Sequence, residues 1–454
     1  QACAISHELG RHLAPGSRAL LLFPPGLEVL QAFFGCLHAG VVAVPVPPLD
    51  GVRLKHSLPR LQAIIADAEA DAILTTESLR AELEEGARDA VAGARWIATD
   101  TIRADGGLER EEAPAPRFKA TADTLAYLQY TSGSTSSPRG VMLSHANVLA
   151  NLAYLRDGFG CGANSVCVTW MPYFHDYGLV EGLLQPLFSD ASCYVLSPIT
   201  LLKRPHRWLE TISRFGGTHT HAPNFAYELC LERIKVEQRT GLDLSSWQVA
   251  GNGAEPVRAD TLRRFSTAFE PYGFRARTFY PAYGLAEATL FVTARGHERD
   301  PGALRLESDA LEHNRVAVAA DDAASASVRE YVSCGVPQPG TDLRIVEPQN
   351  SDECPPRTIG EVWVSSPSVA LGYWRRPDET RATFHARLAG VPDAGPFLRT
   401  GDLGFVEDGE LYVTGRLKDL IVVAGVNHYP QDIEWSVLQT CPELRREHCA
   451  AFCI

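Results

Sequence analysis

Short apolar runs alternate with amphipathic segments in the N-terminal part of the chain, and this alternation restricts the fold more than any other feature. The apolar runs have the length of buried strands, and the segments between them place apolar residues at helical spacing. Strands joined through helices run parallel, because the chain must cross over to return to the same edge of the sheet. The predicted fold class is therefore α/β. Strands are expected at 20–23, 41–46, 72–75 and 94–98, and helices at 27–38, 58–68 and 76–91.

The alternation continues to about residue 330 and then gives way to short alternating strands. Asp408-Gly409 separates two of these strands and predicts a hairpin turn, since this pair adopts positive φ readily. Residues 293–330 contain no aromatic side chain. They predict an insertion with little core of its own, or a surface loop of no consequence. We expect a large N-terminal domain at 1–416, made of α/β subdomains at 1–160 and 161–330 and a small β-barrel-like subdomain at 331–416.

Composition excludes several classes of function. The 454 residues carry a formal net charge of −13, which argues against broad nucleic-acid binding. The eleven cysteines form no CxxC pair, so we interpret them as reduced apolar residues in a cytoplasmic protein rather than as a metal site. The most apolar stretch, 19–48, is interrupted by prolines and charges, and no membrane span is expected.

A run of Ser, Thr and Gly between Thr131 and Gly140 predicts a polyanion-binding loop. Such a run disfavours both helix and central strand, whereas its hydroxyls and converging N–H groups suit phosphate oxygens. An apolar strand at 125–130 leads into it, and Ser144 has the character of an N-cap for the helix that leaves. The loop lacks the Gly-Lys-Ser/Thr end of a Walker A motif. A solvated Ser-rich linker is the alternative.

Further blocks with site character follow in order along the chain. The turns of the blocks 249–258 and 279–289 stand where strands of an open α/β sheet would end, and such sheets bind ligands at those ends. The blocks are 166–178 with His175, 223–230, 249–258 with its Gly-rich turn, 279–289 with Glu287, and 399–403 with Asp402.

These blocks, in this order, resemble the adenylate-forming superfamily of acyl-CoA synthetases, luciferases and peptide-synthetase adenylation domains. Within it, the chain is most similar to the fatty acyl-AMP ligases. Ser136 stands where most members have Gly, and Ala286 where many have Thr, as in that branch. Arg139 replaces the usual Lys and keeps its charge but not its shape. The block 223–230 and the segment 293–330 also match that branch.

The resemblance implies a role for each candidate residue in joining a carboxylate to ATP. Glu287 would ligate Mg²⁺, with a helix N-terminal charge as the alternative, and Asp402 would bind the ribose, with a turn former as the alternative. His175 would stand near the reacting carboxylate, with a structural histidine as the alternative. The phosphates would be held by Thr131, Ser132, Gly133, Ser134, Thr135 and Arg139, the adenosine by Gly253, Ala254, Glu255, Tyr283, Gly284, Asp402 and Arg416, and the acyl chain by Asn224 and Phe225.

The resemblance also implies the partners. The substrate would be a medium- or long-chain fatty acid, and the acceptor the phosphopantetheine thiol of an acyl carrier protein, often part of a polyketide synthase or peptide synthetase in this family. A fatty acyl-CoA synthetase and a degenerate acyl-adenylate-binding module are the alternatives. Lys418 would lie at the hinge to a small α+β C-terminal domain, of which 417–454 would be an incomplete part. The family's catalytic lysine near the end of that domain has no counterpart here, so we expect this chain alone to adenylate slowly.

Overall fold

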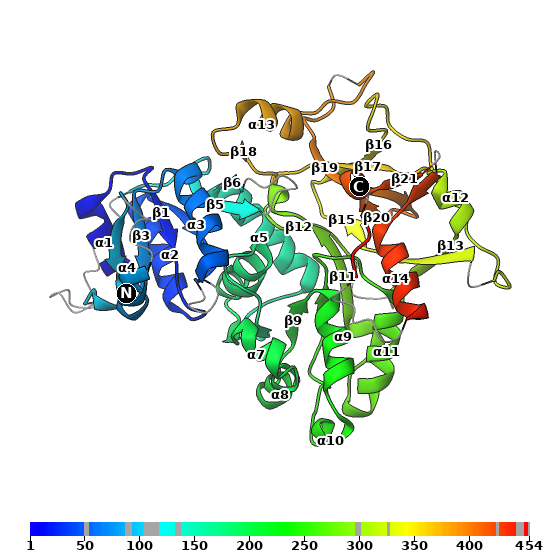
Figure 1. Cartoon of the computed structure of the whole chain (residues 1–454), viewed down its shortest axis with the longest axis horizontal. Helices are drawn as coiled ribbons and strands as arrows, with labels where there is room; N and C mark the ends of the chain where they lie inside the picture. The colour runs from blue at the N-terminus through cyan, green and yellow to red at the C-terminus, as the bar shows by residue number, and fades with distance from the viewer. Residues whose placement is uncertain are drawn as a thin grey trace. The chain divides into compact units, whose positions relative to one another are not determined.

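The computed structural model divides into two compact units, which are treated separately below (Figure 1). Unit 1 comprises Gln1–Thr211, Ala286–Leu290 and Pro367–Arg381, and unit 2 comprises the rest. The predicted domain bounds and the hinge at Lys418 stay predictions. The structure describes residues 1–49, 54–86, 93–103, 118–131, 138–295, 301–324, 327–391, 393–423, 426–441 and 449–452.

Unit 1 is built on a seven-stranded sheet in the order β18-β6-β5-β2-β1-β3-β4. The strands β1 to β5 pair in parallel, and β6 pairs antiparallel with both β5 and β18. The strands are β1 Arg18–Leu21, β2 Val42–Pro45, β3 Ala72–Thr75, β4 Arg95–Ala98, β5 Leu125–Thr131, β6 Arg139–Ser144 and β18 Gly372–Tyr373, with the parallel pair β7 Val166–Thr169 and β8 Ser192–Val195. The helices are α1 Ala2–His12, α2 Glu28–Ala39, α3 Leu54–Ala68, α4 Glu77–Gly86, α5 His145–Phe159, the π-helix Tyr177–Leu184, α6 Gln185–Phe188, α7 Pro198–Lys203, α8 His206–Phe215 and α13 Pro377–Phe384.

The predicted strand–helix alternation of this region is confirmed, with one correction at the Ser-rich loop. The chain was expected to leave the loop as a helix, but β6 first returns antiparallel to β5. The apolar residues that follow the loop, such as Val141 and Leu143, are fully buried in the sheet. The N-cap prediction is correct, since Ser144 Oγ accepts a hydrogen bond from the Asn147 N–H at 3.2 Å.

Unit 2 has its own open sheet, in which β15, β12, β11, β10 and β9 are neighbours in that order. The strands β9, β10 and β11 are parallel, and β12 and β15 are antiparallel additions. An aromatic core that includes Tyr227, Phe265 and Phe279 packs helices α9 and α11 onto it. The elements are β9 His219–Ala222, α9 Asn224–Arg233, α10 Val236–Arg239, β10 Val249–Asn252, α11 Ala259–Phe269, β11 Phe279–Gly284, β12 Phe291–Ala294 and β15 Val336–Pro337.

The remainder of unit 2 is mostly antiparallel, as expected. A four-stranded sheet has the order β16-β17-β19-β20, and the Asp408-Gly409 hairpin is confirmed, with φ of 52° and 80°. The 293–330 segment, predicted to have little core of its own, shares a core with later parts of unit 2 in its described part. Leu306 and Leu311 are 0% and 2% exposed and belong to a core cluster with Phe405. The elements are β13 Ala303–Glu307, α12 Ser308–Glu312, β14 Val328–Val332, β16 Asp342–Val346, β17 Gly360–Ser365, β19 Leu398–Glu407, β20 Glu410–Arg416, β21 Ile421–Val423, β22 Val426–His428 and α14 Pro430–Thr440.

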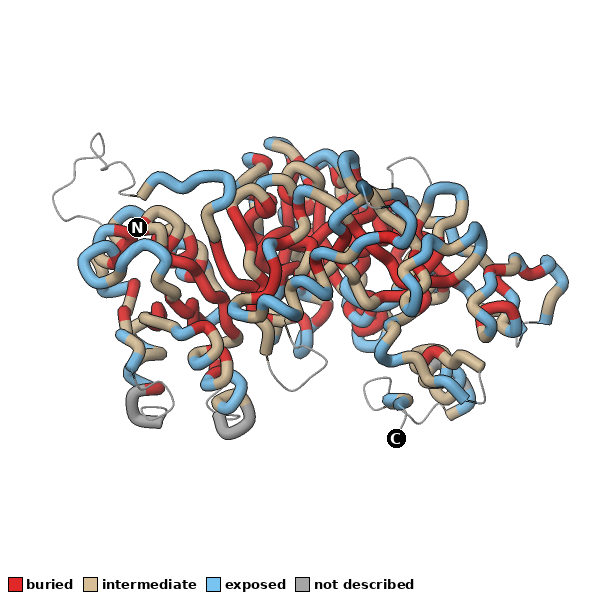
Figure 2. Tube along the Cα trace, turned by 90° about the horizontal axis from the view of Figure 1, so that it is seen from above, coloured by how far each residue is buried: buried red, intermediate tan, exposed pale blue. Residues whose placement is uncertain are grey.

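Burial follows this architecture, with buried residues gathered along the strands and exposed residues on helix surfaces and turns (Figure 2). Within the described part of the chain, we find no helix with the length and apolarity needed to cross a membrane.

Candidate active site

The two ends of the Ser-rich loop face each other across a strand pair. Thr131 is the last residue of β5, Arg139 is the first of β6, and their Cα atoms are register partners. Ser132, Gly133, Ser134 and Thr135 lie outside the described residues, so their predicted phosphate contacts stay predictions. The strand pair therefore holds the predicted loop at both ends.

In unit 1, Arg139 and Glu287 both contact Tyr373, a residue that was not predicted as part of the site. The guanidinium of Arg139 lies 5.4 Å from the ring centroid of Tyr373, and its Nε is 3.1 Å from Glu379 Oε2. The hydroxyl of Tyr373 donates to Glu287 Oε1 at 2.8 Å. Burial and the adjacent Glu287 carboxylate raise the pKa of Tyr373 above its ordinary value, so the phenol remains a donor. One tyrosine thus contacts a cation with its ring and a carboxylate with its hydroxyl.

Several contacts fix the segment that carries Tyr373 to the sheet. Trp374 N donates to Gly140 O at 2.7 Å, so the chain after Tyr373 runs along β6. Arg376 bonds Asp67 at 2.9 Å and the Pro138 carbonyl at 3.3 Å, directly before Arg139. These bonds hold the end of the predicted phosphate loop in place.

The Glu287 site accommodates the chemistry of magnesium but not of a metal bound by protein ligands alone. No group of three or more His, Cys, Asp or Glu residues that could hold a metal occurs among the described residues. Mg²⁺ is commonly bound by one or two carboxylates together with substrate phosphates and water. A single carboxylate joined through Tyr373 to Arg139, at the end of the predicted phosphate loop, fits that pattern.

Replacing Tyr373 by phenylalanine should slow adenylation at least about tenfold, because one hydrogen bond to a charged acceptor contributes ~1.5–3 kcal/mol and ~1.4 kcal/mol is tenfold in rate. The ring beneath Arg139 remains in this variant, so the Arg139 contact should persist. Initial rates of ATP–pyrophosphate exchange check the prediction, with the exposed Tyr194→Phe as control. An unchanged rate would show that the hydroxyl does not orient Glu287.

His175 lies in a turn that is tightly anchored to the sheet. Tyr173 reaches back with its hydroxyl to the Phe23 and Val46 carbonyls at 2.8 and 2.9 Å. Gly178 closes the turn, and a Cβ at this position would lie 2.1 Å from the Pro172 carbonyl oxygen. The turn therefore requires glycine and presents the half-exposed His175 side chain in a fixed place.

Asp176 sets the protonation of this histidine. Its Oδ1 lies 2.5 Å from His175 Nδ1, and both atoms accept from the Tyr177 N–H, at 2.7 Å and 3.2 Å. The Asp176 charge raises the pKa of His175, with burial opposing the shift. The Asp176 charge thus favours the cationic form of the ring.

Asp176→Asn should lower the His175 pKa and with it the pH range of the cationic form. A cationic histidine exists below its pKa, so the alkaline limb of the adenylation profile should move to lower pH in the variant. The pH dependence of pyrophosphate exchange measures this, with the exposed Asp157→Asn as control. An alkaline limb at the same pH in the variant would show that the titration of His175 does not limit adenylation.

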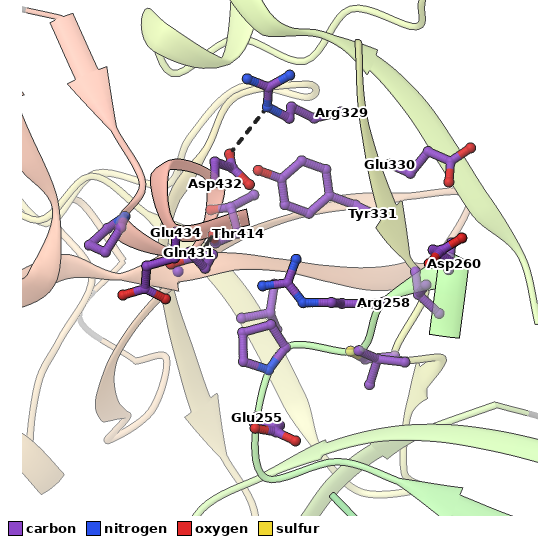
Figure 3. A pocket seen from close by; sticks show the side chains of 18 of the residues that line it. Glu255, Arg258, Asp260, Arg329, Glu330, Tyr331, Thr414, Gln431, Asp432 and Glu434 are labelled. Carbon is purple, nitrogen blue, oxygen red and sulfur yellow. Dashed lines mark hydrogen bonds and ion pairs between the residues drawn. The ribbon is translucent and has the colours of Figure 1, made fainter. Parts of the chain in front are cut away.

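Unit 2 contains a cavity of about 1180 Å³, and Glu255, Arg258 and Asp432 are among the side chains that line it (Figure 3). The turn after β10 forms one wall, and residues of β11, β14, β19, β20 and α14 form the others. Ala254 adopts a positive φ of 65° in this turn. A Cβ at Gly253 would lie 2.8 Å from the Ala282 carbonyl oxygen, which explains the glycine. Of the predicted adenosine residues, the lining includes Ala254, Glu255, Tyr283, Gly284, Asp402 and Arg416.

Asp402 is the buried acceptor of this cavity. It is 6% exposed and accepts from the Tyr283 hydroxyl at 2.7 Å, while Arg416 Nε lies 3.2 Å from its other oxygen. Burial raises the pKa of Asp402, and Arg416 and Tyr283 counteract the rise. Asp402 and Arg416 are register partners on β19 and β20, so the hairpin aligns a carboxylate and a guanidinium. Such a pair can bind neighbouring hydroxyls.

The two predicted acyl residues differ in their surroundings. Asn224 is 5% exposed and makes hydrogen bonds through its amide within the protein, whereas Phe225 at the start of α9 is 41% exposed. The Phe225 N–H donates to Glu255 Oε1 at 2.5 Å, which joins the acyl block to the cavity wall. Lys418 is partly exposed and 4.0 Å from Asp419. All of these ligand and hinge roles stay predictions.

Comparison with known proteins adds the class of enzyme. The family model described as AMP-binding enzyme matches residues 1–374. The chain is 50% identical to the medium-chain-fatty-acid–[acyl-carrier-protein] ligase JamA of Moorena producens (strain JHB), over all of this chain and 76% of that protein. It is 40% identical to a 4-hydroxyphenylalkanoate adenylyltransferase of Mycobacterium marinum, over 96% of this chain and 70% of that protein.

Solved structures agree. A fatty acyl-adenylate ligase from L. pneumophila, in complex with acyl adenylate and pyrophosphate, has a TM-score of 0.86 and 40% identity, covering 100% of this chain and 77% of that one. An adenylation domain of a keto acid-selecting NRPS module, bound to keto acyl adenylate, has a TM-score of 0.83 and 27% identity, covering 97% and 78%.

The chain belongs to the AMP-binding enzyme family. The predicted assignment to the fatty acyl-AMP ligase branch and the predicted α/β class are confirmed by these relatives. An adenine nucleotide as ligand follows from the family.

Proposed function

We propose that this protein activates a medium- or long-chain fatty acid with ATP and passes the acyl group to the phosphopantetheine thiol of an acyl carrier protein. The observation that carries the proposal is the buried Asp402 between Tyr283 and Arg416 in the cavity of unit 2, together with the 50% identity to a ligase of this kind. The buried carboxylate suits a ribose, and the turn that holds Ala254 suits a base beside it.

The first step joins two anions. A carboxylate oxygen forms a bond to the α-phosphorus of ATP, the bond from that phosphorus to the β-phosphate oxygen breaks, and pyrophosphate leaves. In the second step the carrier thiol gives up its proton, its sulfur bonds to the acyl carbon and AMP departs. Little covalent chemistry falls to the protein, which must place the reactants and reduce their repulsion.

The described residues supply that placement. Asp402 and Arg416 orient the nucleoside, Arg139 offers a fixed cation at the end of the phosphate loop, and His175 offers a second positive group for the acid. Mg²⁺, when bound at Glu287, would neutralise phosphate charge. We also propose the cytoplasm as the location, because none of the ten described cysteines forms a disulfide.

The test is acyl transfer by the full-length protein with a medium-chain and a long-chain fatty acid, ATP and either acceptor. Acyl loading of a carrier protein that bears its phosphopantetheine arm is expected, together with pyrophosphate release. The matched control is the same carrier without the arm. Failure to release pyrophosphate with any fatty acid would contradict the proposal.

A fatty acyl-CoA synthetase is the second candidate, because a putative fatty-acid–CoA ligase of Mycobacterium tuberculosis is 39% identical over 95% of this chain. The same assay with free CoA decides between them. Efficient acyl-CoA formation with slow carrier loading would favour the second candidate.

A further inference from the structure

A buried carboxylate near the nucleotide cavity has no role in the reaction described above. Glu228 lies on α9 and is 5% exposed. Its Oε1 accepts a short hydrogen bond from the Thr261 hydroxyl on α11, and its Oε2 is 3.1 Å from Arg264 Nη1. Burial of a carboxylate is unfavourable unless hydrogen bonds and charge compensate for lost water. This carboxylate is compensated on one side by a partly exposed arginine and on the other by a buried hydroxyl.

The charge on Glu228 sets the direction of the next hydrogen bond. An ionised carboxylate only accepts, so the Thr261 hydroxyl must donate its proton to Glu228. The Thr261 oxygen is then left as an acceptor, and it accepts from Asn224 Nδ2 at 3.1 Å. This contact orients the Asn224 amide, because its nitrogen must face Thr261 and its oxygen must face the opposite way.

The side-chain oxygen of Asn224, oriented in this way, accepts hydrogen bonds from both ends of the turn that forms one wall of the cavity. It accepts from the Arg258 N–H at 3.2 Å and from Asn252 Nδ2, at the end of β10, at 3.3 Å. Asn252 and Arg258 bracket the turn 253–258, which carries the positive-φ Ala254.

Figure 3 shows Glu255 and Arg258 of this turn among the side chains lining the cavity. Glu255 also bonds the Phe225 N–H, so the turn is tied twice to the start of α9. The wall is therefore supported by α9 and α11 as well as by its own strand.

We propose that Glu228 is a positioning residue for nucleotide binding, acting through Thr261 and Asn224 on the turn 253–258. The inference rests on the proposed function, since it takes the cavity of unit 2 as the nucleotide site. It adds Glu228, which does not line the cavity and which would affect nucleotide binding through Thr261 and Asn224.

Three variants of the full-length protein test whether Glu228 acts through Thr261 and Asn224. Thr261→Val keeps the shape but removes the hydroxyl, Glu228→Ala removes the carboxylate, and the third variant combines both. Each single change should raise the KM for ATP about tenfold in pyrophosphate exchange, with kcat within about threefold, because the turn contacts the nucleotide and not the reacting atoms. The double variant should also show about a tenfold rise, since residues acting in one chain are not additive.

Two further variants separate positioning from simple loss of structure. Glu228→Gln retains an oxygen that can accept from Thr261 and should stay within about threefold of the wild-type KM for ATP. The matched control is Glu232→Gln, one turn further along α9 and exposed, which should change nothing. Tm values that fall with an unchanged KM would overturn the inference, as would additive effects in the double variant.

Hydrogen exchange gives a readout that needs no activity. Peptides covering 253–260 should exchange about tenfold faster in Thr261→Val than in wild type, because the bond that protects the Arg258 N–H is weakened. Unchanged exchange in this peptide would overturn the inference whatever the kinetics show. Absence of pyrophosphate exchange in the wild type would instead refute the proposed function, and the peptide data would still decide whether the contacts hold the turn.

Discussion

Replacing Asp402 by alanine is expected to raise the dissociation constant for ATP about a hundredfold, the largest effect on binding in this protein. Hydrogen bonds from a ligand to a charged acceptor contribute ~1.5–3 kcal/mol each, and the two ribose hydroxyls would lose that acceptor. The variant also leaves Arg416 without the carboxylate that aligns it. Isothermal titration of the full-length protein with ATP measures the change, and Asp393→Ala, at an exposed position, is the control. Unchanged affinity would place the ribose elsewhere.

Asp402→Asn provides a second check through stability, because burial raises the Asp402 pKa in the folded protein. A carboxyl with a raised folded pKa destabilises the fold once pH exceeds that pKa, and this penalty disappears below the unfolded pKa. The amide carries no charge at any pH. The variant should therefore bind ATP more weakly yet melt at a higher temperature at neutral pH, and the gain should vanish in acid. A lower Tm at neutral pH would contradict this account.

Glu287→Gln should lower kcat for adenylation by about a hundredfold to a thousandfold, the size seen when one preorganised electrostatic group is lost. The amide oxygen can still accept from Tyr373, so the local structure should persist and the loss should report the missing charge. Pyrophosphate exchange measured across a Mg²⁺ titration gives the rate and the half-saturating concentration. The exposed Glu82→Gln on α4 is the control.

ATP affinity can distinguish a metal-ligating role of Glu287 from a general disturbance of the site by the substitution. ATP affinity measured without Mg²⁺ should be unchanged in Glu287→Gln, whereas the gain in affinity on adding Mg²⁺ should shrink. A kcat within about threefold of wild type, or an equal loss of ATP affinity with and without Mg²⁺, would refute the assignment.

Local signals in the sequence predicted the local structure well. The parallel strands from β1 to β4 follow from apolar runs of strand length, the α5 N-cap from Ser144, and the hairpin from Asp408-Gly409, because each signal depends on residues close in the chain. The return strand β6 was not predicted, because its few apolar residues stand between a polar loop and a helix N-cap. The packing of Leu306 against Phe405 could not be predicted, because the two residues lie far apart in the sequence.

The site could be predicted in its parts but not in its contacts. Tyr373 meets Glu287 across 86 positions, and Tyr283 meets Asp402 across 119, so no local pattern announces either pair. Resemblance to a family supplied Glu287, Tyr283 and Asp402, but it did not supply Tyr373. The positions of side chains such as Glu228, which act through neighbours, require the folded arrangement of two helices.

The double attachment of α9 to the turn 253–258 bears on any attempt to redesign chain-length preference. Asn224 and Phe225 stand side by side, yet the first supports the nucleotide wall and the second exposes 41% of its surface. A library that randomises both would lose ATP affinity in most members and hide useful changes in acyl selectivity. Engineering should keep Asn224, which bonds the turn, and begin at Phe225, the exposed residue that is predicted to contact the acyl chain.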